Sequence, residues 1–112
     1  IVTDYQRTSA RRLIHALYIE KAWRGGVCLI GDLNTGRGGE IYQKLEVAGL
    51  KDRIPAEIDT TLDPDHPYAM RGGRVVTDYV FTCGCADEFG VDVKLLSGIS
   101  DHCALLVKVT PA

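Results

Sequence analysis

The sequence lacks any apolar run near the roughly 20 residues that cross a bilayer, and it lacks the apolar core of a signal peptide. Aromatic residues make up only 7% of the 112 residues, but hydrophobic residues make up 46% and charged residues 25%. These proportions are ordinary for a globular protein and exclude disordered, collagen-like and coiled-coil chains. The length alone predicts one domain and is too short for two.

An excess of either charge is also missing, because 13 basic residues face 15 acidic ones and the net charge is −2. This balance argues against a protein that holds nucleic acid by bulk charge. The charge is uneven, since the first 24 residues carry +3 and the rest carry −5. A solvated helix face explains the basic segment most simply, and a surface that faces phosphate is the alternative.

The four cysteines are too few for a disulfide framework and favour a reducing compartment such as the cytoplasm. Cys28 and Cys103 lie in apolar runs, so they are predicted to be small core residues. Cys83 and Cys85 have C-x-C spacing, whereas zinc knuckles and redox sites use C-x-x-C. A zinc site here would need two further ligands.

Local patterns predict an α+β chain. Thr3 and Gln6 resemble a capping box, and an apolar face then repeats at helical spacing to about Trp23, before Gly25 and Gly26. A second helix is predicted over 40–48, with Gly49 as its cap, and 51–73 reads as irregular.

Strands are predicted where apolar residues run together. The run 27–30 is continuous, so this strand is expected to be buried on both faces. Three more strands are predicted over 75–81, 91–96 and 103–109. No helix is predicted between these last three, so they are expected to be antiparallel neighbours.

Polar residues interrupt or flank these apolar strands. Asp32 and Asn34 directly follow the first strand, Asp78 lies within the second, and Asp101 and His102 directly precede the last. Carboxylates are costly to bury unless they are paired or bind a cation, so a shared, partly buried polar site is predicted. Oxygen ligands without a thiolate suit a hard cation, Mg²⁺ (or Mn²⁺), and the histidine adds a candidate for proton transfer.

In this order, the polar residues resemble the last three signature motifs of the endonuclease/exonuclease/phosphatase (DNase I-like) superfamily. The matching segments are Gly31-Asp32-Leu33-Asn34, Thr77-Asp78-Tyr79-Val80-Phe81 and Ser100-Asp101-His102. Segments 41–52 and 61–69 also resemble stretches of the family, so the resemblance covers nearly the whole chain. Two departures are Thr77, where the family usually has isoleucine or leucine, and Arg74, displaced from the usual position of an arginine.

The resemblance implies a four-layer α-β-β-α sandwich, of which residues 1–112 form about the C-terminal half. The glutamate, asparagine and histidine that the family's first half supplies are not found before Gly31, and the only methionine is Met70. The chain is therefore expected to be a partial domain with two helices on one face, without one sheet and half of the metal site. Alone it is expected to be inactive and to self-associate, or to need the missing N-terminal half as its partner.

The implied reaction is metal-assisted hydrolysis of a phosphate ester. By resemblance, Asp32 activates or orients the attacking water and contributes to the metal site. Asn34 holds a phosphate oxygen or belongs to the metal shell, and Asp101 is a metal ligand. His102 contacts the scissile phosphate, and Asp78 orients His102. The division of base duties between Asp32 and His102 stays open.

The substrate is a phosphate ester whose class stays open among DNA, RNA, a lipid and a small phosphoester. Arg37 is a candidate substrate-binding residue, and Arg71 and Arg74 are further candidates for gripping nucleic acid. The two alternatives to an enzyme are a non-catalytic relative and a module that binds a ligand or metal. The glycine-rich loop departs from a P-loop and from an EF-hand at Arg37.

Overall fold

The computed structural model describes residues 2–111, except the side chain of Trp23. Along the chain lie three α-helices, five strands and one 3-10 helix, with these bounds: α1 Asp4–Arg24, β1 Gly26–Asp32, α2 Glu40–Val47, β2 Lys51–Asp52, α3 Pro67–Met70, β3 Asp78–Gly84, η1 Cys85–Glu88, β4 Gly90–Leu96 and β5 Ala104–Thr110. None of the described helices combines the length and the apolar character that a membrane span requires.

Helix α1 begins and ends where the sequence predicts. The backbone N–H of Gln6 donates to Thr3 Oγ1 over 3.1 Å, and the Thr3 N–H donates to Gln6 Oε1 over 2.9 Å, so the capping box is confirmed. Gly25 ends the helix with a φ of 79°, a left-handed conformation that suits glycine. The end of α2 differs slightly, because its cap is Ala48 and Gly49 follows with a φ of 95°.

The strands form two antiparallel sheets. One has the order β1-β3-β2, and the other pairs β4 with β5. The prediction that the last three strands are neighbours is therefore right for β4 and β5 but wrong for β3, which pairs with β1 and β2. The short helix η1 between β3 and β4 carries the chain from one sheet to the other.

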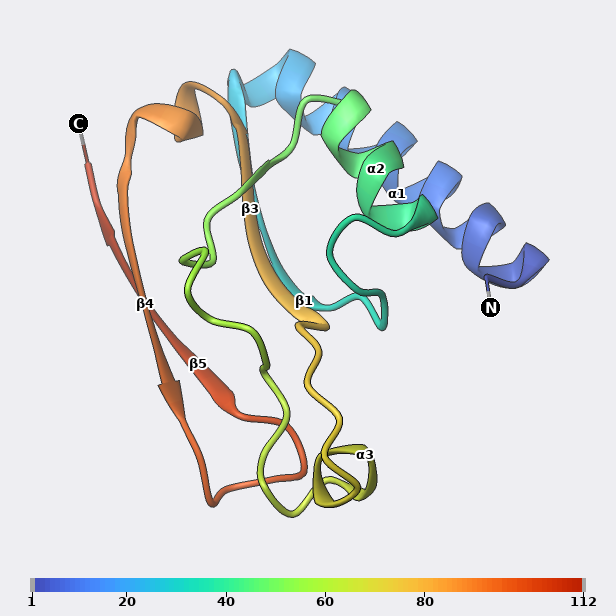
Figure 1. Ribbon diagram of the computed structural model, residues 1–112. Helices are drawn as coiled ribbons and strands as arrows, with labels where there is room; N and C mark the ends of the chain where they lie inside the picture. The colour runs from blue at the N-terminus through green and yellow to red at the C-terminus, as the bar shows by residue number, and fades with distance from the viewer. Residues whose placement is uncertain (1, 112) are drawn as a thin grey trace.

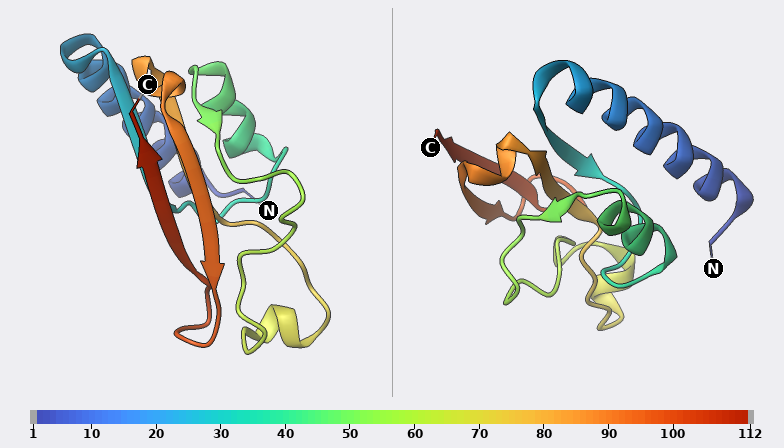
Figure 2. Two further views of the ribbon diagram at one scale, coloured as in Figure 1. Left: turned by 90° about the vertical axis from the view of Figure 1, so that its left-hand side faces the viewer. Right: turned by 90° about the horizontal axis from the view of Figure 1, so that it is seen from above.

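The molecule has three layers in the order helices, sheet, sheet. Helices α1 and α2 cover one face of the β1-β3-β2 sheet, and the β4–β5 pair lies along its other face (Figures 1 and 2). On the helix side, the Tyr42 ring of α2 packs on Tyr79 and Phe81 of β3 at centroid distances of 5.7 and 5.8 Å. The expectation that this chain lacks one sheet is wrong, because β4 and β5 pack alternate apolar side chains against the same core.

The prediction that the first strand is buried on both faces is also wrong. Strand β1 is an edge strand, and β3 is its only neighbour in the sheet within residues 2–111. Ile30 is 51% exposed and Cys28 is exposed, whereas Val27 and Leu29 on the other face pack against the core. Cys28 is therefore not a core residue, and Cys103 is half-buried.

The start of β3 and the stretch 51–73 differ from what the sequence pattern predicts. Strand β3 begins at Asp78, so this carboxylate lies at the start of the strand and not in its middle. The residues before it are held by other segments: the Leu33 N–H donates to Thr77 O over 2.9 Å, and the Thr61 N–H donates to Val75 O over 3.0 Å. The stretch 51–73 contains β2 and α3, which are too short to give a periodic signal.

Candidate functional site

The centre of the candidate site is a hydrogen bond between His102 and Asp78. His102 Nδ1 lies 2.8 Å from Asp78 Oδ2. The same oxygen accepts hydrogen bonds from the hydroxyls of Thr61, over 2.7 Å, and of Thr77, over 3.0 Å. Asp78 is only 8% exposed, so these donors offset the cost of burying its charge. With one oxygen so fully used, Asp78 is suited to orient the imidazole.

Asp32 faces His102 from the opposite side. In the sheet register Asp32 is the direct partner of Asp78, because β1 and β3 run antiparallel. The Asp32 Oδ2 atom lies 3.8 Å from His102 Nε2, and Oδ1 accepts the backbone N–H of Asn34 over 2.8 Å. Asn34 has a φ of 50°, which asparagine tolerates better than most residues. The imidazole therefore lies between one buried and one exposed carboxylate.

The loop that carries Asp101 and His102 is fixed by segment 61–63. Leu62 and His102 form an antiparallel bridge, with the Cys103 N–H donating to Thr61 O over 2.8 Å and the Asp63 N–H donating to Asp101 O over 3.0 Å. The buried Asp63 carboxylate accepts the Gly98 N–H over 2.6 Å, which holds the pKa of Asp63 below its usual range. These contacts fix the loop 97–103 to segment 61–63.

The surroundings of His102 raise its pKa above the ordinary value of 6.5. The hydrogen bond to Asp78 is the largest cause; burial opposes it, and the charges of Asp78, Asp32 and Asp101 add to it. Because the folded chain binds this proton more tightly, the stability gained is complete below the pKa of the unfolded chain. That stability is lost as the pH rises through the pKa of folded His102.

We expect Asp78→Asn to lower the pKa of His102, because the substitution removes the largest cause of the upward shift together with a negative charge. The measurement is a titration of the three histidines by NMR. His15 is exposed on α1 and serves as the internal control, because the substitution removes none of its contacts. An unchanged pKa of His102 in the variant would contradict the hydrogen bond seen here.

Asp101 and His66 form a second group around the same histidine. One ligand-type atom each from His66, Asp101 and His102 lie within 4.8 Å of one another, as do those of Asp32, Asp78 and His102. Asp101 is exposed, and its Oδ1 accepts the Ser100 hydroxyl over 3.1 Å. The structure thus brings Asp32, Asp78 and Asp101 to His102 in two groups, and the Asn34 backbone N–H is hydrogen-bonded to Asp32.

The side chain of Arg37 makes its contacts away from His102. Its guanidinium contacts Asp52 at 3.1 Å and donates to the carbonyl oxygens of Ile58, over 2.6 Å, and Ile54, over 2.9 Å. These contacts fasten the glycine-rich loop to segment 52–58 and use the donors that a phosphate would need. Among the residues that the structure describes, no contact therefore supports Arg37 as a substrate-binding residue. Arg74 is similarly paired, with Asp59 at 2.6 Å.

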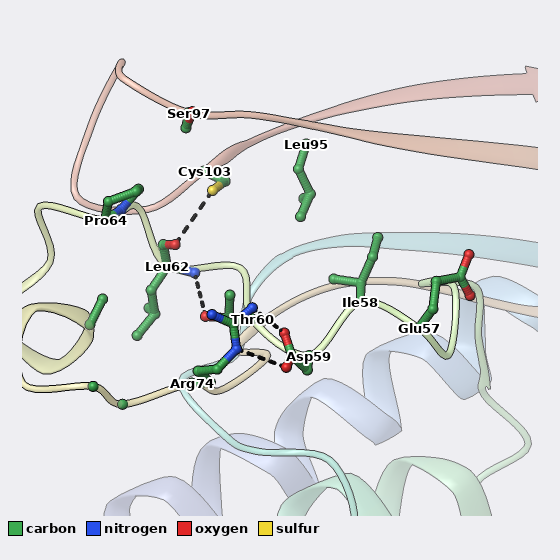
Figure 3. A pocket seen from close by; sticks show the side chains of 13 residues that line it. Glu57, Ile58, Asp59, Thr60, Leu62, Pro64, Arg74, Leu95, Ser97 and Cys103 are labelled. Carbon is green, nitrogen blue, oxygen red and sulfur yellow. Dashed lines mark hydrogen bonds and ion pairs between the residues drawn. The ribbon is translucent and has the colours of Figure 1, made fainter.

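A cavity of about 580 Å³ lies beside the loop contacts (Figure 3). Its wall includes Leu62, which forms the bridge with His102, and Cys103, which follows His102 in the chain. The Arg74–Asp59 ion pair lines another side, so the charges there are balanced. This volume falls within the range of small-molecule sites, but the side chains of Asp78, Asp101 and His102 do not line the cavity.

The sequence did not identify three residues that shape this site. Thr61 donates to Asp78, Asp63 fixes the loop 97–103, and His66 lies beside His102. All three belong to the segment read as irregular, where no periodic pattern marks a role. The available signal was that His66 is one of only three histidines and lies in a stretch that resembles the family.

The donor atoms fit a hard divalent cation in part. Asp32 and Asp101 are exposed carboxylates around His102, and Mg²⁺ commonly takes one or two carboxylates and completes its shell with water and phosphate oxygens. Asp78 is a poorer ligand, because its Oδ2 already accepts two hydroxyl donors and faces His102. Asp32 and Asp101, which belong to two different groups that share His102, are therefore the carboxylates that would be available to a metal.

Comparisons of the chain with protein-family models, with curated proteins and with solved structures found no match. The functional interpretation therefore depends on the residues and the geometry described above.

Proposed function

We propose that this chain carries part of the active site of a Mg²⁺-dependent (or Mn²⁺-dependent) hydrolase of phosphate esters. The observation that supports this most directly is the position of His102, held by Asp78 at 2.8 Å and facing Asp32 at 3.8 Å. A histidine oriented by one carboxylate and paired with a second, exposed carboxylate is a common arrangement for moving a proton to or from water. The resemblance of the three motifs to the DNase I-like superfamily points to the same reaction.

Each residue has a distinct task in this proposal. With its Nδ1 proton held by Asp78, neutral His102 has a lone pair at Nε2, while the protonated ring offers an N–H to a phosphate oxygen. Asp32 Oδ2 accepts a hydrogen bond from the attacking water. The Asn34 side chain is exposed beside Asp32 and donates to a phosphate oxygen without adding negative charge. A bound metal ion would polarise the phosphoryl group and neutralise its developing charge.

The remaining groups of the site come, in this proposal, from a complementary segment of the kind that the family's first half provides. The exposed face of β1, with Ile30 51% exposed, is one surface that such a segment could cover. Self-association of the chain through the same face is the competing outcome. Hydrolysis should therefore be assayed on the natural protein that contains residues 1–112, purified from its own cells.

We expect hydrolysis to require the metal. The protein is assayed with Mg²⁺ on plasmid DNA, RNA, sphingomyelin vesicles and a phosphosugar, and then with EDTA. EDTA should remove the metal and abolish turnover, because Asp32 and Asp101, which would contribute to holding it, are both exposed. Re-addition of Mg²⁺ is the control that separates metal loss from denaturation. Turnover that persists in EDTA, or no turnover of any of these substrates, would contradict the proposal.

A metal- or ligand-binding module without catalysis is the second candidate. It is favoured by the two Asp/His groups that share His102, since such groups also hold ions where no reaction occurs. Calorimetric titration distinguishes the candidates. Mg²⁺ binding without hydrolysis of any tested ester would support the module, whereas binding accompanied by turnover would support the hydrolase.

A further inference from the structure

His66 is held in a fixed orientation by the backbone of its own turn. The backbone N–H of Tyr68 donates to His66 Nδ1 over 3.0 Å, and His66 caps the short helix α3. The side chain is half-buried. Within residues 2–111 this is the only hydrogen bond of the His66 ring, so Nε2 is left for another partner.

This contact determines where the neutral ring carries its hydrogen. A nitrogen that accepts a hydrogen bond has a lone pair, and a neutral imidazole has only one N–H. Since Nδ1 of His66 accepts, its hydrogen is on Nε2. His102 has the opposite arrangement, because its Nδ1 faces the carboxylate of Asp78 at 2.8 Å and donates to it. Its Nε2 therefore has a lone pair in the neutral ring and an N–H for a phosphate oxygen in the protonated ring.

The two rings with opposite tautomers are neighbours. Their centroids are 5.5 Å apart and their planes are at 81°. A ring nitrogen from each and a carboxylate oxygen of Asp101 lie within 4.8 Å of one another. A phosphate group held at His102 would therefore lie close to the His66 ring.

A transition metal is the other ligand that two histidines and an aspartate could hold. Metal ligation at His66 Nε2 would require a lone pair there, and the hydrogen would then be on Nδ1. That hydrogen would point at the Tyr68 N–H, whose nitrogen is 3.0 Å away. Two donors would face each other, so the geometry favours an acceptor such as a phosphate oxygen over a metal.

We propose that His66 is a substrate-binding residue whose Nε2–H donates a hydrogen bond to a non-bridging oxygen of the phosphate group held at His102. This rests on the proposed phosphoester hydrolysis and adds a second imidazole to its site. Such a donor stabilises the negative charge that gathers on the phosphoryl oxygens during attack by water. It transfers no proton, so it acts through binding of the charged oxygen.

Two substitutions separate the donor from the helix cap. His66→Asn keeps a side-chain oxygen that accepts the Tyr68 N–H, as asparagine does well at this position, but it loses the distant N–H. His66→Gln keeps an N–H at a reach similar to Nε2. His15→Asn is the matched control, because His15 is exposed on α1. Binding of inorganic phosphate in the presence of Mg²⁺ is measured by calorimetry for all four proteins.

We expect His66→Asn to weaken phosphate binding about tenfold, the usual effect of losing one hydrogen bond to a charged acceptor. His66→Gln should recover most of this loss, and His15→Asn should bind as the parent does. In ¹⁵N NMR of the parent, His66 should show a bare Nδ1 and a protonated Nε2. Unchanged phosphate binding in His66→Asn, absence of phosphate binding in the parent, or tight Zn²⁺ binding that this variant loses would each overturn the proposal.

The outcome is independent of whether the protein hydrolyses an ester, since phosphate binding and the tautomer are both measured without turnover. Binding that depends on His66 in a protein without turnover would support His66 as a phosphate ligand and count against the hydrolase. Turnover in a protein whose phosphate binding is unaffected by His66→Asn would support the hydrolase and overturn the role of His66.

Discussion

Replacing His102 with alanine is expected to lower phosphoester hydrolysis about a thousandfold, within the usual range for a positioned acid–base residue. The substitution removes the imidazole that contacts both the buried Asp78 and the exposed Asp32. The loss should fall on kcat more than on KM, because the interaction strengthens as charge develops on the phosphate. Steady-state kinetics on the substrate that the protein turns over fastest gives both constants.

The matched control for this substitution is His15→Ala, on the exposed face of α1. It removes the same side chain far from the loop 97–103 and should leave both constants unchanged. A second variant, Asp78→Asn, keeps the volume of the carboxylate but no longer fixes the His102 tautomer, so kcat should fall while the chain stays folded. If His102→Ala retained near-parental kcat while remaining folded, His102 would have no part in the reaction.

The grouping of the polar residues could be predicted from sequence because each lies at the end of a strand or in the adjoining loop. Asp32 follows an apolar run, and Asp101 and His102 precede one. Their convergence follows from pairing that the sequence implies only loosely. Asp32 meets Asp78 because β1 and β3 run antiparallel in full register, and His102 joins them because segment 61–63 holds its loop.

The contacts that fix this group could not be predicted, because they join residues far apart in the chain without a local pattern. Thr61 bonds to Asp78, 17 residues away, and Gly98 bonds to Asp63, 35 residues away. The pairing of β3 also depends on contacts between segments that are far apart along the chain. Adjacency along the chain favoured β4, whereas burial of Tyr79 and Phe81 against α2 is compatible with pairing to β1 and β2.

The error about β1 has a separate physical origin. A run of four apolar residues predicts burial on both faces, yet such a run also fits an edge strand whose second face is covered only in part. Ile30 is 51% exposed on that face. The apolar character that the sequence shows at β1 therefore marks a surface suited to a further contact, which is the basis for expecting a complementary segment or self-association.

The core under the helices should be the most sensitive part of the fold. Leu45 of α2 is fully buried, with 0% of its surface exposed, and belongs to the same cluster as Tyr79 and Phe81. We expect Leu45→Ala to lower the free energy of unfolding by about 2–5 kcal/mol, through lost burial and the cavity that remains. This is a large part of the roughly 5–15 kcal/mol that stabilises a typical domain. Urea denaturation followed by circular dichroism measures it.

Leu106→Ala is the matched control, because it makes the same substitution on β5 at a residue that is 57% exposed. Its effect should stay within about 0.5 kcal/mol, as for most surface positions. The comparison tests the layer order directly, since Leu45 faces the sheet from the helix layer and Leu106 points away from it. Equal losses for the two variants would mean that the outer face of β5 is buried in solution, by a second copy or by another segment.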